Sequence, residues 1–437
     1  MLVALTIAGS DSVGGAGIEA DIKAFVSQGV HGAVAITAVT AQNTQRVSAI
    51  YPMAADAVVA QIDAVLDDVH VSAAKTGMLY SQEIVSAVAG RLSGRGIPLV
   101  VDPVMVAGTG DPLATETLLI ALRKDLIPIA TIITPNIPEA EALVEYRIAD
   151  DRTVRQACRD IANMGAEAVL LKGGHMSGPT CVDTFFYNGK FLQVEAPRIE
   201  GRGHGGGCIL SSYMAANLAK GMGLWEASLA AKASINDAIA CQYAIGKGIP
   251  VVEPLGRQLR DGQRYQVAVR LRVAALEMID LLPRDWVPEV GTNMVFALPG
   301  ARERDEVCAL ESRIVGLRDR ACSNGWVAFG ASRHMAAVAL SVMKYDGGMR
   351  SAMNLRYSDE NVKALRKAGL SIGSFERGEE PKHYPRDLDY GTEDAIRALG
   401  FVPDVIYDRG SPGKEPMVRL LASSPEELVS KFKMVLV

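Results

Sequence analysis

The sequence predicts an α/β protein with a mostly parallel sheet covered by helices on both faces, followed by a second, smaller α/β domain. In the first half, short apolar runs alternate with amphipathic stretches of helical spacing, a pattern typical of βαβ units. After a segment rich in glycine, proline and charge, the pattern is again mixed but contains more arginine. The 437 residues suffice for two domains. We place the first domain at 1–250, a linker at 251–264 and the second domain at 265–437.

The alternation can be followed element by element. Asn188-Gly189 lies between two apolar runs and favours a two-residue hairpin turn, so we expect an antiparallel ribbon at the sheet edge. Ser424-Pro425 followed by Glu427 predicts the start of the last helix. The expected strands are Leu2–Ala8, Ala33–Val39, Val69–Ala74, Leu99–Val101, Ala130–Ile133, Ala168–Leu171, Cys181–Tyr187 and Lys190–Ala196. The expected helices are Ile18–Ser27, Ala54–Leu66, Gln82–Leu92, Thr115–Leu126, Glu139–Val144, Val154–Met164, Cys208–Ala219, Trp225–Ile245 and Val267–Leu282.

The charge balance excludes several classes of partner. Forty-five basic and fifty acidic side chains give a formal charge of −5, so no net positive field attracts nucleic acid or an anionic membrane. The longest uncharged stretch, Ala24–Gln45, is interrupted by polar residues and fails the requirement for a membrane span. The six cysteines form no C-x-x-C pair, which is typical of reduced thiols. The N-terminus indicates a first strand rather than a signal peptide. We therefore expect a cytoplasmic protein that binds small molecules. We also expect a homo-oligomer, although these observations do not bear on its assembly.

Two glycine clusters suggest ligand chemistry. Gly15-x-Gly17-x-x-Ala20 mimics a dinucleotide fingerprint, but the acidic residue that should follow the second strand is absent from Thr40–Asn43. The second cluster, 201–208, directly precedes a helix, and its backbone N–H groups could form an anion hole for a transferring phosphoryl group. At that helix start we expect a lowered pKa for Cys208, which would favour a thiolate base. A tight turn with an inert cysteine is the alternative.

The first half also carries an ordered series of motifs. It resembles the hydroxymethylpyrimidine phosphate kinases, a family of the ribokinase-like superfamily, over roughly residues 1–245. The motifs are GSD with GGAG (9–17), TAQNT (40–44), KTGM (75–78), VDPVM (101–105), TPNIPEAE (134–141), LLKGGH (170–175) and HGGGC (204–208). The resemblance implies ATP and Mg²⁺ as cofactors.

The resemblance also implies roles for individual residues. Cys208 would take the proton from the substrate hydroxymethyl group. The substrate pocket would contain Asp11, Gln42 and Met78, and the nucleotide would be held by Lys172, Asn136, Gly205 and Gly207, with Asp102 and Glu139 serving Mg²⁺.

Two departures and one neighbouring family qualify the kinase interpretation. Gly206 replaces the family's usual threonine in the glycine loop, and Glu19 replaces its usual glutamine. Because Cys208 is retained, we expect an active kinase. Pyridoxal kinases share the scaffold, so pyridoxal-kinase-like specificity is an alternative.

The second half contains polar clusters at which one element gives way to another. Ser332-Arg333-His334 begins a helical pattern whose N–H groups could accept a phosphate. Arg350, Arg409 and Lys414 are donors of the kind that bind phosphate or diphosphate. Taken singly, an arginine on a helix or turn is more often a solvated surface residue.

Together these clusters resemble the thiamine phosphate synthase domain of the ThiN type, over about residues 265–437. The motifs are EVGTN (289–293), FGASRH (329–334), RSAMNLRY (350–357), PDVIYDRG (403–410) and GKEP (413–416). The resemblance implies condensation of hydroxymethylpyrimidine pyrophosphate with thiazole phosphate. His334 and Arg350 would then be catalytic, and the phosphate ligands would be Ser332, Asn354, Asp408 and Lys414. A ThiN-like domain that only senses thiamine phosphate is the alternative.

Overall fold

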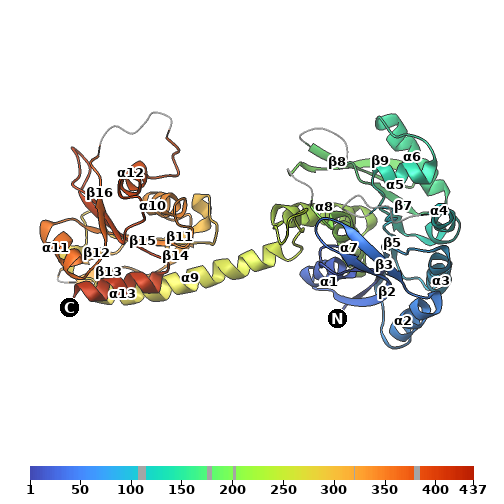
Figure 1. The fold of residues 1–437 in the computed structure, drawn as a ribbon, viewed down its shortest axis with the longest axis horizontal. Coiled ribbons are helices and arrows are strands. Elements are labelled where there is room, and N and C mark those ends of the chain that lie inside the picture. The colour runs from blue at the N-terminus through green and yellow to red at the C-terminus, as the bar shows by residue number, and fades with distance from the viewer. Residues whose placement is uncertain (107–114, 175–179, 200–202, 319, 378–383) are drawn as a thin grey trace. The chain divides into compact units, whose positions relative to one another are not determined.

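The computed structural model describes residues 1–106, 115–174, 180–199, 203–318, 320–377 and 384–437 (Figure 1). By its internal contacts the chain divides into two units, Met1–Leu259 and Arg260–Val437.

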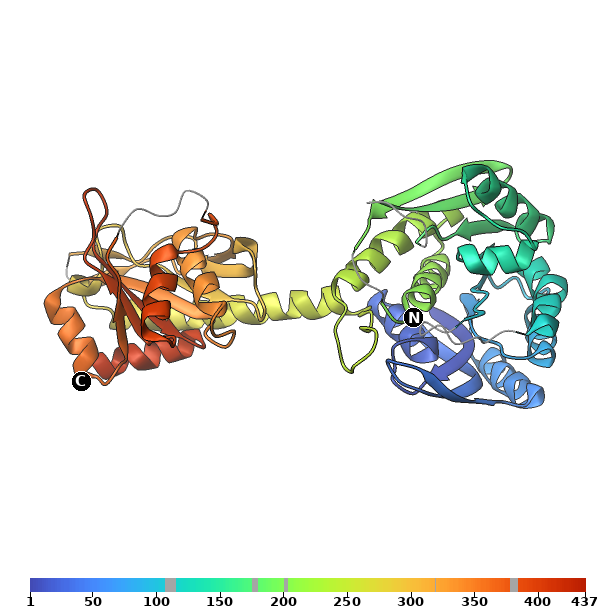
Figure 2. The ribbon, with the colours of Figure 1, turned by 45° about the horizontal axis from the view of Figure 1, so that its top comes forward.

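The N-terminal unit is built on a mostly parallel sheet. In the described residues this sheet has nine strands in the order β3-β2-β1-β4-β5-β6-β7-β8-β9. Pairing is parallel from β2 through β7 and antiparallel for β3 and for the β8–β9 hairpin at the other edge (Figure 2). The strands are β1 (Val3–Asp11), β2 (His31–Gln42), β3 (Val47–Pro52), β4 (Ala73–Thr76), β5 (Leu99–Val101), β6 (Ile132–Ile133), β7 (Ala168–Leu171), β8 (Thr180–Tyr187) and β9 (Lys190–Pro197).

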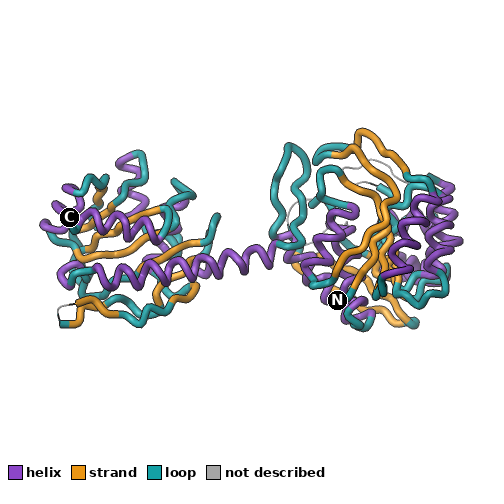
Figure 3. The backbone as a smooth tube through the Cα atoms, turned by 90° about the horizontal axis from the view of Figure 1, so that it is seen from below, coloured by secondary structure: helices purple, strands orange, loops and turns teal. Residues whose placement is uncertain are grey.

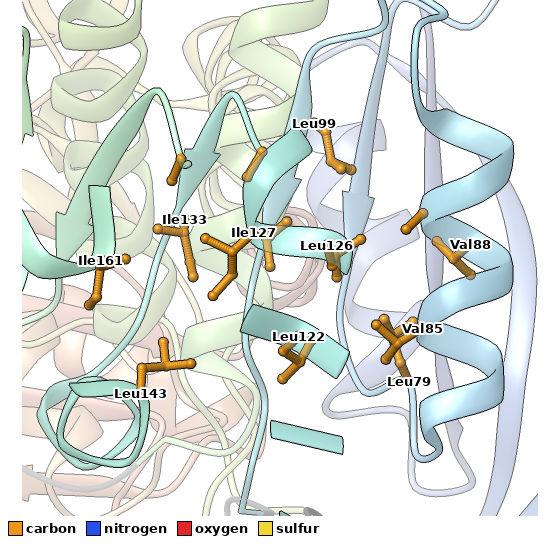
Figure 4. Packing of buried hydrophobic residues seen from close by; sticks show 14 of the residues in the cluster. Leu79, Val85, Val88, Leu99, Leu122, Leu126, Ile127, Ile133, Leu143 and Ile161 are labelled. Atoms are coloured by element: carbon orange, nitrogen blue, oxygen red, sulfur yellow. The ribbon is translucent and has the colours of Figure 1, made fainter. Parts of the chain in front are cut away.

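Helices cover both faces of this sheet, as the sequence predicts (Figure 3). On one face α2, α3, α4, α5 and α6 enclose an aliphatic core, and Figure 4 shows part of it, with Val85 and Val88 from α3 and Ile133 from β6. On the other face α1, α7 and α8 pack around Phe25 and Tyr213. The helices are α1 (Gly17–Ser27), α2 (Ala55–Asp68), α3 (Gln82–Leu92), α4 (Glu116–Ala121), α5 (Ile137–Val144), α6 (Asp151–Asn163), α7 (Gly206–Ala219) and α8 (Leu224–Ala240).

Several expected boundaries are wrong. The sequence predicts a strand at Val69–Ala74, whereas β4 is Ala73–Thr76 and includes the buried Lys75. The edge strand β3 is not among the predicted strands. The helix expected to run to Ile245 ends at Ala240. The expected helix after Thr115 continues beyond α4 as a π-helical turn and a 3-10 turn.

The C-terminal unit contains a second, mostly antiparallel sheet. Its described strand order is β14-β11-β10-β15-β18-β17-β16, with β16 and β17 parallel, and β12 and β13 form a separate pair. Helices α9, α11 and α13 cover one face, and α10 and α12 cover the other. The strands are β10 (Met294–Ala297), β11 (Val307–Leu310), β12 (Val315–Leu317), β13 (Arg320–Cys322), β14 (Val327–Phe329), β15 (Ser351–Arg356), β16 (Ile372–Ser374), β17 (Val405–Asp408) and β18 (Met417–Ala422). The helices are α9 (Gly256–Leu281), α10 (His334–Met343), α11 (Asp359–Lys367), α12 (Tyr390–Leu399) and α13 (Pro425–Val435).

The expected linker at 251–264 is largely helical. Helix α9 begins at Gly256, well before the expected helix start at Val267, and the division between the units falls inside it. Among the described residues, no helix combines the length and the apolar character that a membrane crossing requires.

Candidate functional site

The predicted kinase residues gather at the carboxyl edge of the parallel sheet. This is the edge at which open α/β sheets bind their ligands. Asp11 ends β1, Asp102 follows β5, Asn136 follows β6 and Lys172 follows β7. Cys208 lies in the first turn of α7. Strand order alone therefore brings together motifs that lie far apart in the sequence.

A buried charge cluster links Asp102, Lys172 and Glu139. The Lys172 ammonium lies 3.0 Å from a carboxylate oxygen of Asp102 and 3.9 Å from one of Glu139. The second oxygen of Asp102 accepts a hydrogen bond from the Ser211 hydroxyl at 3.1 Å. A Cβ atom on Gly207 would lie 3.4 Å from the Lys172 nitrogen. The glycine loop thus lies beside the lysine ammonium.

Asn136 and Glu139 also form the N-terminal cap of α5. The Asn136 side chain accepts the Glu139 N–H at 2.9 Å, and the Glu139 carboxylate accepts the Asn136 N–H at 2.8 Å. Burial raises the pKa of Glu139 to about 7, although Lys172 opposes this effect. The capping box fixes both side chains, so their positions do not depend on a bound ligand.

Asp11 organises the loop that follows β1. Its carboxylate accepts backbone N–H groups of Val13, Gly15 and Ala16, and it lies 2.8 Å from Nε2 of His204. Although burial opposes it, the bond to His204 lowers the pKa of Asp11. The same His204 nitrogen lies 3.0 Å from the Gln42 amide nitrogen. His204 therefore connects two predicted substrate residues, although the sequence analysis gave it no role.

Met78 and Glu19 shape the same region. The Met78 methyl group lies over Gly9, where a Cβ atom would approach it to 2.3 Å. The Thr37 hydroxyl donates to the Met78 carbonyl at 2.6 Å, which fixes the backbone there. Glu19 accepts the Ser10 hydroxyl and the Asp11 N–H, so the unusual glutamate stabilises the turn of the first motif.

The loop geometry supports an anion hole, but the expected pKa of Cys208 is wrong. Gly205 has φ of +90° and its Cβ would lie 1.8 Å from the Gly15 carbonyl oxygen, so this position requires glycine. Burial raises the pKa of the Cys208 thiol to about 11, while Lys75 opposes the rise and Asp102 adds to it. Burial outweighs the effect of the helix N-terminus. The thiol is therefore protonated at neutral pH in the free protein.

The C-terminal unit contains a cavity of about 430 Å³. It opens beside the starts of α10 and α12, and its wall includes the predicted residues Ser332, His334, Asn354 and Lys414. Other lining residues are Val290, Gly291, Asn293, Arg313, Met335, Phe375, Glu376, Arg377, Asp389, Tyr390, Gly391, Asp394, Gly413, Glu415, Met417 and Arg419.

Asp408 lies behind the cavity and holds two of its arginines. Its carboxylate accepts Nε and Nη2 of Arg377 at 2.7 and 3.1 Å, and Nη1 of Arg419 at 2.9 Å. Asp408 is fully buried and Arg419 is 1% exposed. Although burial opposes it, the two guanidinium groups lower the pKa of Asp408. Asp408, which the sequence predicts as a phosphate ligand, is here a buried anion that positions two cations.

His334 is a neutral group in this cavity. Its side chain is 44% exposed and Nδ1 lies 3.7 Å from an Asp389 oxygen. The surrounding cavity wall and the nearby Arg419 lower its pKa to about 4, although Asp389 opposes this shift. At neutral pH one ring nitrogen can donate and the other can accept a hydrogen bond.

Asn354 and Ser332 are engaged by the backbone around the cavity. The Asn354 amide accepts the Asn293 N–H at 2.8 Å and donates to the Gly291 carbonyl at 2.9 Å. The Ser332 hydroxyl accepts the Met335 N–H at 3.3 Å at the start of α10. Both residues fix loops of the cavity wall.

The structure places Arg350 outside this cavity wall. Its guanidinium lies 4.6 Å from the centre of the Phe296 ring and donates to the Ala297 carbonyl at 3.1 Å. Arg313, Arg377 and Arg419 line the cavity instead. Sequence reasoning missed these three, and Arg313 lay unmarked between two motifs.

Comparisons with known proteins agree with this division. Residues 11–253 match the family model of phosphomethylpyrimidine kinase, and residues 269–434 match that of thiamine-phosphate synthase ThiN. A hydroxymethylpyrimidine/phosphomethylpyrimidine kinase of Rhizobium meliloti is 46% identical over 264 residues, which are 59% of this chain and 99% of that protein. A thiamine biosynthesis bifunctional protein of Geobacter sulfurreducens is 44% identical over 246 residues, 56% of this chain and 50% of that protein.

Solved structures resemble the N-terminal unit. A pyridoxal kinase of Bacillus subtilis in complex with ADP has a TM-score of 0.55 and 32% identity, and covers 59% of this chain and 99% of that one. A phosphomethylpyrimidine kinase of Clostridium difficile has a TM-score of 0.50 and 39% identity, and covers 55% of this chain and 100% of that one. The chain belongs to the phosphomethylpyrimidine kinase family and continues into a thiamine-phosphate synthase ThiN domain, so it combines two functions of thiamine biosynthesis.

Proposed function

We propose that the two units perform successive reactions on one pyrimidine. The N-terminal unit transfers phosphoryl groups from ATP to hydroxymethylpyrimidine and then to its monophosphate. The C-terminal unit joins the resulting pyrophosphate to thiazole phosphate and releases diphosphate. The observation that carries the proposal is that a kinase family and a synthase family each match one unit, and that residues of the synthase motifs, Ser332, His334, Asn354 and Lys414, line one cavity.

At the kinase site, fixed donors face the transferring group. The N–H groups of the glycine loop and the Lys172 ammonium neutralise charge on the phosphoryl group as it moves. Cys208 accepts the proton of the substrate hydroxyl as the oxygen attacks phosphorus. Asp11, Gln42 and Met78 would hold the pyrimidine, and Asp11 and Gln42 are joined through His204. The thiol first releases its own proton to solvent, and only the thiolate fraction, which burial makes small, can act as the base.

Asp102 and Glu139 suit a magnesium ion that the nucleotide brings. Mg²⁺ is usually bound through one or two carboxylates together with substrate phosphates and water, rather than by a full protein cage. Two buried carboxylates that share Lys172 match this need, and the described residues contain no cluster of three or more metal-ligating side chains. The ion would neutralise phosphate charge beside the glycine loop.

At the synthase site, four cationic and four acidic side chains line the cavity, and the cations would hold the leaving group. Loss of diphosphate from the pyrimidinylmethyl carbon requires neutralisation of its charge and placement of the thiazole nitrogen. Arg313, Arg377, Lys414 and Arg419 supply positive charge in the cavity lining. The neutral His334 offers a hydrogen bond. We therefore assign leaving-group stabilisation to the cavity arginines rather than to Arg350.

A coupled assay tests the proposal. The full chain is incubated with hydroxymethylpyrimidine, ATP, Mg²⁺ and thiazole phosphate, and the products are followed by mass spectrometry. We expect thiamine phosphate, and accumulation of pyrimidine pyrophosphate when thiazole phosphate is omitted. Pyrimidine pyrophosphate that accumulates despite thiazole phosphate would indicate a sensing domain. Light scattering on the same sample tests the predicted homo-oligomer.

Pyridoxal phosphorylation is the second candidate activity of the N-terminal unit. The pyridoxal kinase fold likeness at 32% identity favours it. A competition assay with equal pyridoxal and hydroxymethylpyrimidine distinguishes the two, and we expect the pyrimidine to be preferred. A higher kcat/KM for pyridoxal would reverse the assignment.

A further inference from the structure

The imidazole of His204 is buried between two predicted substrate residues. The side chain is 2% exposed, and its Nε2 atom lies 2.8 Å from a carboxylate oxygen of Asp11 and 3.0 Å from the Gln42 amide nitrogen. A Cβ atom on Gly15 would lie 2.4 Å from the imidazole Cδ2, so the loop after β1 packs directly on the ring. The backbone N–H of His204 donates to the Pro250 carbonyl at 2.8 Å. One fixed nitrogen atom therefore faces two side chains, and its protonation decides how each can bond.

The surroundings of the ring decide which nitrogen carries the proton. Asp11 also accepts three backbone N–H groups, which favour its charged form, and a lone pair on Nε2 at 2.8 Å would repel this carboxylate. The other ring nitrogen of His204, Nδ1, is buried without a hydrogen-bond partner among the described residues. A buried N–H without a partner is costly and rare, whereas an unpaired acceptor is less so. Both observations favour a neutral ring with its proton on Nε2.

This tautomer conflicts with the orientation of the Gln42 amide. With the nitrogen end of the amide beside the Nε2–H group of His204, two donors face each other at 3.0 Å. At the other end, Thr40 Oγ1 lies 3.4 Å from the Gln42 amide oxygen and 3.0 Å from the Ser10 carbonyl oxygen, so one hydroxyl proton has two acceptors. A half-turn of the amide removes both conflicts, because its oxygen then accepts from His204 and its NH2 group donates to Thr40.

We propose that His204 is a positioning residue for substrate specificity, whose Nε2–H holds the oxygen of the Gln42 amide and leaves the NH2 group for the pyrimidine. One amide hydrogen is bound by Thr40, and the other is free for an acceptor atom of the pyrimidine ring. Gln42 is partly exposed, and the Ser12 hydroxyl bonds both its N–H and its carbonyl, at 2.8 and 2.7 Å, so its backbone is already fixed. The inference rests on the proposed role of Gln42 in holding the pyrimidine.

A matched pair of variants tests this role in the full chain. His204→Gln can place an amide N–H where Nε2 lies, whereas the shorter side chain of His204→Asn reaches only the level of Nδ1. In His204→Asn we expect KM for hydroxymethylpyrimidine to rise about tenfold, as for the loss of about one hydrogen bond, with little change in kcat or in KM for ATP. His204→Gln should restore most of the wild-type KM. A merely structural role would change kcat or both KM values together.

A double-mutant cycle shows whether the effect passes through the Gln42 amide. If it does, the rise in KM caused by His204→Asn disappears when the same change is made in Gln42→Ala. If His204 only supports the backbone of the glycine loop, the same rise persists in the double variant, and the inference is wrong. Calorimetry on each variant shows that the compared proteins are equally folded.

Nitrogen NMR of the full chain with labelled histidine tests the tautomer in the wild-type protein. Protonated and unprotonated ring nitrogens give separate signals, and those of His204 are identified by their absence in His204→Gln. We expect a protonated Nε2 and an unprotonated Nδ1. A proton on Nδ1 alone would overturn the inference, because Nε2 would then accept from the Gln42 amide nitrogen. This result does not depend on whether His204→Asn folds.

The outcomes distinguish this inference from the proposed function. If Gln42→Ala raises KM for hydroxymethylpyrimidine but His204→Asn does not, the role of His204 is wrong and that of Gln42 stands. If Gln42→Ala leaves this KM unchanged, the proposed substrate role of Gln42 is wrong and the inference falls with it.

Discussion

Asp408→Asn is the substitution that most sharply tests the structure of the synthase cavity. The change keeps the shape of the side chain but removes the charge that holds Arg377 and Arg419. Asp408 is 0% exposed and Arg419 is 1% exposed, so the variant leaves a buried guanidinium without its counter-ion. Breaking such a pair from one side costs about 3–5 kcal/mol.

This loss corresponds to a measurable change in the C-terminal unit. For a domain of this size, about 2–4 °C per kcal/mol gives a fall in Tm of about 6–20 °C. Calorimetry of the full chain measures the fall, and the condensation rate should drop because both arginines lose their positions. Pyrimidine phosphorylation by the other unit should be unchanged. Asp404→Asn is the control, because Asp404 is 29% exposed and its loss should lower Tm less.

One result would refute the reasoning. If Asp408→Asn leaves Tm unchanged and raises KM for thiazole phosphate or pyrimidine pyrophosphate, then Asp408 contacts substrate directly. That outcome would restore the role predicted from the sequence and show that the two arginines do not need this carboxylate.

Three other predictions concern the cavity arginines, the glycine loop and His334. Arg377→Ala should slow condensation by about 10²–10³-fold, as loss of one fixed donor does. Arg350→Ala should slow it less than about tenfold, because Arg350 lies over Phe296. Equal losses of the two variants in steady-state assays would contradict the cavity assignment. Gly205→Ala should abolish phosphorylation, because φ of Gly205 is +90° and the new Cβ would meet the Gly15 carbonyl oxygen. Gly206→Ala should retain it, because the new Cβ would meet no atom within 4 Å. An active Gly205→Ala would disprove the need for this loop geometry. The folded-state pKa of His334 lies near 4, below the ordinary 6.5, so as pH falls the unfolded chain takes up the proton first. The stabilisation from the neutral ring is therefore complete above pH 6.5 and is lost toward pH 4. The free energy of unfolding in urea should fall with pH in that window, and this fall should be absent in His334→Gln. An equal fall in the variant would show that His334 is not its cause.

The sequence predicts the fold where local patterns and long-range packing agree. The hairpin of β8 and β9 is predicted correctly from Asn188-Gly189, because these two adjacent residues are enough to specify its turn. The position of β4 is predicted wrongly because Lys75 is polar, and its burial is stabilised by Asp21, 54 positions away in the sequence. Strand β3 is missed because an edge strand that ends at Pro52 shows little alternation.

The same distinction applies to the two sites. Asp102 and Lys172 could be predicted because each follows a parallel strand, and such ends meet at one edge. Arg377 could not, since its position depends on the pairing of β16 with β17 and on its hydrogen bond to Asp408. A lowered pKa for Cys208 is expected from the helix N-terminus alone. Burial and two carboxylates raise the pKa of the thiol by more than the helix lowers it.

The most direct test of the account separates the two reactions in one chain. Cys208→Ala is given either hydroxymethylpyrimidine with ATP, Mg²⁺ and thiazole phosphate, or preformed hydroxymethylpyrimidine pyrophosphate with thiazole phosphate, and thiamine phosphate is measured by mass spectrometry. We predict no product from the first mixture and a wild-type rate from the second. Equal product from both mixtures would contradict the role of Cys208, and no product from either, with wild type active, would contradict the independence of the two sites.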